Sequence, residues 1–185
     1  MDALFDTVPG FDQPLAVLKH CHDRIRKQLA TLGRLPAHLA SHGVDRQAQQ
    51  AAQAILRYFQ LAAPLHHEDE EIDLLPRLSA LARNQDAALL HQALALILQQ
   101  HGEMAQQWTP IEAQLLALAG GKIWALSTDK IAAFQALYQE HMALEESQIA
   151  PMAARLFDLA TMQEVGAAMQ TRRHISTAKE NDHVD

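Results

Sequence analysis

The sequence predicts an all-α protein, built as an antiparallel up-down four-helix bundle. Alanine (33 residues) and leucine (27 residues) are its commonest residues, whereas Val, Ile and Thr together number 21. Gly and Pro number seven each, which is too few for the many turns of a β sandwich or barrel. A chain of 185 residues favours one domain with a core of its own.

The first two long segments carry apolar residues at helical spacing. The first begins near Asp12, a candidate N-cap, and is expected to end at Gly33. Its apolar stripe consists of Leu15, Leu18, Ile25, Leu29 and Leu32. The second runs from near Asp45 to about Leu81, and we expect Pro64 and Pro76 to bend or end it.

Two further long segments and a short one complete the chain. The third helix is predicted over residues 86–118, bent at Pro110, and the fourth from Ser127 or Thr128 to about residue 159. Short connections favour antiparallel neighbours. We expect residues 1–160 to form the bundle, and residues 161–185 to form a short C-terminal helix near 162–169 and a flexible tail.

Charge and cysteine content exclude several classes of function. The net charge is −7, and no Lys/Arg block is longer than the pair Arg172-Arg173, so nucleic acid is not an expected partner. The single Cys21 cannot form an internal disulfide, which fits a reducing compartment. Neither a basic leader nor a run of 18 apolar residues is present, so we expect a cytoplasmic protein without a membrane partner. The sequence does not indicate the oligomeric state.

A repeated motif carries the candidate chemistry. HHEDEEIDLLP begins at His66 and HMALEESQIAP begins at His141, with the two copies offset by 75 residues. In each copy a His precedes the first of two adjacent glutamates by four residues, which gives the pairs His66 with Glu70 and His141 with Glu145. Residues i and i+4 share one face of a helix, so each pair presents an imidazole and a carboxylate in the same direction.

The other two long helices each supply one more inward imidazole. His22 lies on the apolar stripe of the first helix, and His101 lies among apolar residues of the third. The chain therefore looks like an internal duplication of an αα-hairpin. Six buried polar groups without partners would be costly, and a bound cation would remove that cost.

The donor types indicate which metals fit. Imidazole with carboxylate and no thiolate suits Fe, Mn, Zn or Ni, and bridging carboxylates favour two metals roughly 3.5–4 Å apart. We expect two iron ions, joined by an oxo or hydroxo bridge, with Zn or Mn as alternative occupants. If each iron takes two imidazoles and one oxygen from each glutamate, one position per iron stays open for a small ligand.

Other interpretations of the same residues are a solvated acidic face and ordinary core histidines. His20 and His67 adjoin the chosen ligands on more polar faces, and either one is an alternative to its neighbour if the helix phase shifts near a proline. Glu71 and Glu146 are either hydrogen-bond acceptors behind the ligands or solvated residues, and we expect the latter. Tyr138 is either a core residue or a group that contacts a bound ligand.

The motifs LKHCHDRI, HHEDEEIDLLP, QQHGEM and HMALEESQIAP, over about residues 12–158, resemble the hemerythrin-like HHE cation-binding domain. The resemblance implies an antiparallel four-helix bundle and a non-haem di-iron centre bridged by Glu70 and Glu145. It assigns the ligands to His22, His66, Glu70, His101, His141 and Glu145. Oxygen-carrying hemerythrins have a second histidine four residues before the one on the third helix, where this chain has Ile97.

The loss of that histidine makes redox chemistry or sensing a better expectation than reversible oxygen carriage. The first hypothesis is a di-iron protein that binds, senses or reduces O₂, peroxide or NO, with enzyme status left open. The alternative is an iron-binding or other metal-binding module with a regulatory or storage role and no catalysis. A structural bundle without metal is the third.

Overall fold

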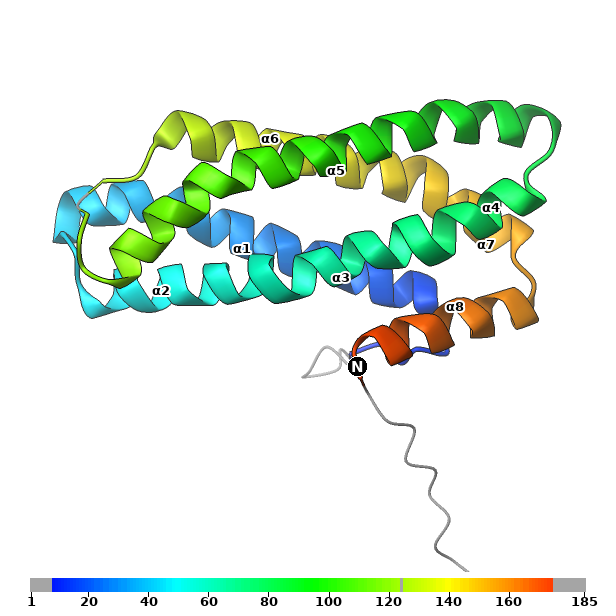
Figure 1. Ribbon diagram of the computed structural model, residues 1–185, viewed down its shortest axis with the longest axis horizontal. Coiled ribbons are helices and arrows are strands. Elements are labelled where there is room, and N and C mark those ends of the chain that lie inside the picture. The colour runs from blue at the N-terminus through cyan, green and yellow to red at the C-terminus, as the bar shows by residue number, and fades with distance from the viewer. Residues whose placement is uncertain (1–7, 124, 175–185) are drawn as a thin grey trace, which may run out of the picture.

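The computed structural model describes residues 8–123 and 125–174, and its long helices lie side by side as a bundle (Figure 1). Every regular element in these ranges is helical, which confirms the all-α prediction. The elements are α1 (Pro14–His42), α2 (Arg46–Arg57), η1 (Tyr58–Ala62), α3 (Ala63–Glu68), η2 (Asp69–Leu74), α4 (Leu75–Leu81), α5 (Asn84–Ala119), α6 (Thr128–Leu144), η3 (Glu145–Ile149), α7 (Ala150–Leu156) and α8 (Leu159–Arg172).

The packing order places polar residues between two apolar clusters. Helix α1 contacts α2 and α6, and α5 contacts the same two helices. One cluster contains Ile25 and Met104, whereas the other contains Leu18 and Ile97. His22 lies between Leu18 and Ile25 in the sequence, and His101 lies between Ile97 and Met104. Each of these helices therefore contributes apolar side chains to both clusters and a histidine at the level between them.

Three π-helical turns, η1, η2 and η3, interrupt the second and fourth long helices. Each π turn ends two residues before a proline, which is Pro64, Pro76 or Pro151. In a regular α-helix, the proline ring would clash with the carbonyl four residues earlier. At these three prolines a wider π turn shifts that carbonyl, whereas α1 and α5 continue through Pro36 and Pro110 without a π turn. The predicted bends at Pro64 and Pro76 therefore take the form of π turns.

The first helix is longer than predicted. It continues through Gly33 to His42, and Gly43, with φ of 68°, follows its last residue. Gly33 has a different role: Nε2 of Gln135, from α6, donates to the Leu29 carbonyl at 2.9 Å, and a Cβ on Gly33 would lie 2.6 Å from that nitrogen. The glycine permits a close helix contact. The predicted end at Gly33 and the N-cap at Asp12 are both wrong, because Gln13 holds the cap position without a side-chain bond.

The C-terminal helix is also longer than expected, and its end is tied to the bundle. Arg172 forms ion pairs with Asp69 and Asp73, and Arg173 donates to Asp69 at 3.1 Å. The expectation that the tail frays from Arg172 onward is therefore wrong for these two residues; residues 175–185 lie outside the described part. Across residues 8–123 and 125–174, no helix has the length and hydropathy that a membrane crossing requires.

Candidate metal centre

The structure brings the six predicted ligands together at the level between the apolar clusters. All six side chains are buried. They come from every long helix: His22 from α1, His66 from α3, Glu70 from η2, His101 from α5, His141 from α6 and Glu145 from η3.

The donors form two sets that share both glutamates. One set is His22, His66, Glu70 and Glu145, and the other is Glu70, His101, His141 and Glu145; within each set the ligand atoms all lie within 4.8 Å of one another. Both sets therefore combine two imidazoles with the same two carboxylates.

The Glu70 carboxylate divides its oxygens between the two sets. Its Oε1 lies 3.1 Å from Nε2 of His66, and its Oε2 lies 3.4 Å from Nε2 of His101. Oε2 of Glu145 lies 3.1 Å from Nε2 of His22 and 3.3 Å from Nε2 of His141. Each carboxylate thus contacts imidazoles of both halves of the chain.

Several of these buried atoms have no hydrogen-bond partner. They are Nε2 of His22, both ring nitrogens of His66, Oε2 of Glu70 and both carboxylate oxygens of Glu145. Buried polar atoms are normally paired, because burying them alone is costly. Oxygen and imidazole nitrogen donors of this kind match the preferences of Fe, Mn and Zn. The residues present therefore fit a bound transition metal.

Burial also shifts the proton equilibria of the donors. It lowers the pKa of His66 well below its ordinary value, with the nearby His22 adding to the effect. Burial, with a smaller contribution from His101, lowers the pKa of His141 to about 3. Burial and the adjacent Glu145 raise the pKa of Glu70 well above its usual range. His66 and His141 are consequently neutral at pH 7, as metal-binding imidazoles must be.

The second glutamate of each pair orients a histidine from the other half of the chain. Nδ1 of His22 donates to Oε1 of Glu146 at 2.9 Å, and Nδ1 of His101 donates to Oε1 of Glu71 at 2.6 Å. Partial desolvation would raise the pKa of Glu146, but hydrogen bonds from His22 and Arg26 outweigh it and lower the pKa. The expectation that Glu71 and Glu146 are merely solvated is therefore wrong. With Nδ1 carrying the proton, Nε2 is the atom left to bind a metal.

The remaining two imidazoles differ from each other. Nδ1 of His141 lies 3.2 Å from Oε1 of the buried Gln100, which precedes His101. At His66 both ring nitrogens lack a partner, and the residue before His22 is Cys21 instead of glutamine. The duplicated halves are therefore alike in their donors but unlike in the groups around them.

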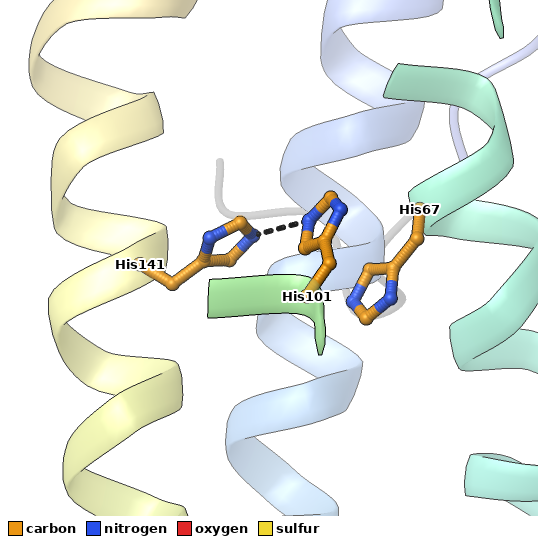
Figure 2. Close-up of side chains that lie close together, drawn as sticks. All are labelled: His67, His101 and His141. Atoms are coloured by element: carbon orange, nitrogen blue, oxygen red, sulfur yellow. Dashed lines mark hydrogen bonds between the residues drawn. The ribbon is translucent and has the colours of Figure 1, made fainter. Parts of the chain in front are cut away.

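The two neighbouring histidines, His20 and His67, lie differently in the structure. His20 belongs to none of the metal-type donor clusters found among the described residues. His67 forms an additional cluster with His101 and His141 (Figure 2). Its ring stacks on that of His101, with centroids 4.0 Å apart, whereas His66 keeps its place in the first set. The sequence predicts a more polar face for His67 and allows for a change of helical phase near a proline; in the structure, π turns η1 and η2 flank α3.

Comparison with known families identifies the domain to which these residues belong. Residues 13–153 match the model of the hemerythrin HHE cation-binding domain. The chain belongs to this family. Membership in the hemerythrin family implies metal binding, and the His/Glu clusters are compatible with it.

The chain is also similar to a bacterial protein of nearly the same extent. It is 28% identical over 165 residues to an uncharacterized protein of Haemophilus influenzae, a match that covers 89% of this chain and 92% of that protein.

Proposed function

We propose that this hemerythrin-family protein holds two iron ions, one at each donor set, and that it binds, senses or reduces O₂, peroxide or NO. Its scaffold would be an antiparallel up-down four-helix bundle, which the contacts of α1 and α5 with both α2 and α6 support. Iron would supply redox chemistry and an open position for a small ligand.

One observation carries the proposal: buried donors, several of them without a hydrogen-bond partner, fall into two sets that share Glu70 and Glu145. A single cation would leave one pair of imidazoles without a role. Two cations would use both pairs, and the opposed oxygens of Glu70 support a bridging role for it.

The residues around the donors would prepare the site before a metal arrives. Glu146, Glu71 and Gln100 each lie within hydrogen-bond distance of an Nδ1 atom, so three imidazoles are held with Nε2 inward. Such outer partners fix the orientation and tautomer of a ligand and increase metal affinity.

A second candidate function is a metal-binding regulatory module without catalysis. The observation that favours it is the ion pairing of Arg172 and Arg173 with Asp69, because Asp69 directly precedes Glu70. A shift of Glu70 at the metal site would then be transmitted through Asp69 to the C-terminal helix α8.

The test is a metal analysis of protein purified without chelator, combined with near-ultraviolet and visible spectra. We expect two irons per chain and charge-transfer bands that respond to dithionite and to azide or peroxide. Charge-transfer bands that do not change with any added ligand would favour the regulatory module. Absence of any bound transition metal would contradict both candidates.

Substitution links the metal to the named donors. His101→Ala should lower the metal content, because it removes a donor of the second set. His91→Ala is the matched control, since His91 is exposed on the same helix and should leave the metal content unchanged. Equal metal content in the two variants would contradict the assignment of His101.

A further inference from the structure

The two sides of the donor cluster differ in the space that adjoins them. Beside His22, Glu70 and Glu145 lies a cavity of only about 30 Å³. Beside His101 lies a cavity of about 200 Å³, to which His67 also contributes. The larger cavity therefore has room for a small molecule, whereas the smaller one has room for little more than a water molecule.

The walls of the larger cavity are aromatic. Of the nine Phe, Trp and Tyr residues in the chain, four line it: Phe59, Trp108, Phe134 and Tyr138. The rings support one another, with centroids 4.9 Å apart for Phe59 and Trp108 and 5.0 Å apart for Phe134 and Tyr138. Walls of this kind favour an apolar molecule over a chain of waters, since water needs several polar partners.

His67 contributes an imidazole to the wall of this cavity. Its ring is held in place by stacking on that of His101, with centroids 4.0 Å apart. The exposed residues Pro64 and Ala105 also line the cavity, so it reaches the surface between α3 and α5. Its inner end is at His101, a donor of the second set.

We propose that this cavity binds a small organic molecule of about the size of benzene, with an apolar body and a single hydrogen-bonding group that pairs with the imidazole of His67. A cavity of 150 Å³ with apolar walls is enough for benzene, whereas drug-sized ligands need about 300 Å³ or more. A diatomic gas would leave most of the space empty. The bound molecule would also approach a metal held by His101, and this part of the proposal rests on the proposed function.

Phenol and toluene are the probes that test the cavity, because they share a ring and differ in the hydroxyl group. Binding is measured by calorimetry on the full chain, both chelator-treated and iron-loaded. We expect one phenol per chain in both states, and tighter binding of phenol than of toluene. No binding of either probe up to its solubility limit would overturn the proposal.

Matched substitutions locate the bound probe. Ala105→Phe, at the mouth of the cavity, should weaken phenol binding at least tenfold, and Ala105→Leu serves if that variant is poorly folded. Ala113→Phe, on an exposed position of the same helix, should leave the affinity within twofold. His67→Phe keeps a stacked ring but should reduce the preference for phenol over toluene about fivefold. Unchanged phenol affinity in Ala105→Phe would overturn the location.

The metal-dependent part of the proposal is tested by a separate measurement, the affinity for azide. In iron-loaded protein, bound phenol should weaken azide binding, followed by the charge-transfer bands. If phenol does not change the affinity for azide, the inference that the molecule approaches the metal is overturned, but binding of phenol in the cavity is not. If the chain binds no iron, the proposed function fails, and the two probes still decide the cavity.

Discussion

Glu146 and His22 are 124 residues apart in the chain, yet Oε1 of Glu146 accepts a hydrogen bond from Nδ1 of His22 at 2.9 Å. Arg26 holds the same carboxylate at 2.8 and 2.9 Å. The other half of the chain repeats the relationship with Glu71 and His101. Each Glu-Glu pair therefore offers its first member to the centre of the site and its second to a histidine of the opposite half.

Glu146→Gln should weaken metal binding by about 10- to 100-fold with little change in the folded structure, because the amide orients His22 less strongly than a carboxylate does. Competition against a chelator measures the affinity. Glu140→Gln, at an exposed position of α6, is the control and should bind metal as the unmodified chain does. Equal affinities in the two variants would show that Glu146 does not support the site.

Glu70→Gln should change stability in opposite directions with and without metal. The raised pKa of Glu70 means that its contribution to stability is fully present at low pH and is lost as the pH rises. Removing the carboxyl should therefore stabilise the metal-free protein at pH 7 by about 1–2 kcal/mol. The same change should abolish the stabilisation that metal binding provides.

Calorimetric melting with iron or with chelator measures both effects of Glu70→Gln. A loss of stability in both states would mean that Glu70 acts as an ordinary structural hydrogen-bonding residue instead of a metal ligand.

In the Glu70→Gln variant, which removes the opposite pH dependence that the raised pKa of Glu70 causes, the metal-free protein should lose stability below about pH 6.5. Burial lowers the pKa of His141 from 6.5 to about 3, so the unfolded chain takes up a proton in this range while the folded one does not. Stability from this group is present above pH 6.5 and declines as the pH falls toward 3. At pH 5.5 the loss is about 1 kcal/mol for His141 alone, and His66 acts in the same direction.

Urea denaturation at a series of pH values measures this loss, and His141→Gln should flatten the slope. If the free energy of unfolding of metal-free Glu70→Gln stays constant from pH 7 to pH 5, the burial of neutral imidazoles is contradicted.

Replacing both Arg172 and Arg173 with methionine should destabilise the fold by about 3 kcal/mol. Asp69 is completely buried, and the change leaves its charge without cationic partners. Chemical denaturation measures the effect, and adding Asp69→Asn to the double variant should restore most of the loss. Arg155→Met is a suitable control because its ion pair with Asp86 lies at the surface. A triple variant no more stable than the double one would refute this explanation.

The sequence was sufficient for the short-range part of this architecture. Helical spacing indicated the long helices, and the repeat indicated which side chains the structure brings together, because His66 with Glu70 and His141 with Glu145 depend only on an i to i+4 relationship. The start of the second helix followed from Asp45, whose side chain accepts from the Ala48 amide at 2.8 Å.

Features that depend on distant contacts could not be predicted in this way. Gly33 resembles a helix end until Gln135 of another helix is placed against it. The roles of Glu71 and Glu146 depend on π turns, which change the helical phase that periodicity assumes. Arg172 and Arg173 look like part of a polar tail, because their acidic partners are about a hundred residues away in the chain.

The ion pairing of Asp69 also determines at which stage of synthesis the bundle can complete its folding. A ribosome that has translated residues 14–156 has already delivered all six donors, but not the two arginines that neutralise Asp69. The nascent bundle then carries an uncompensated charge one residue from Glu70. We expect the bundle to reach its full stability only after α8 has left the exit tunnel, because the buried Asp69 gains its cationic partners only then.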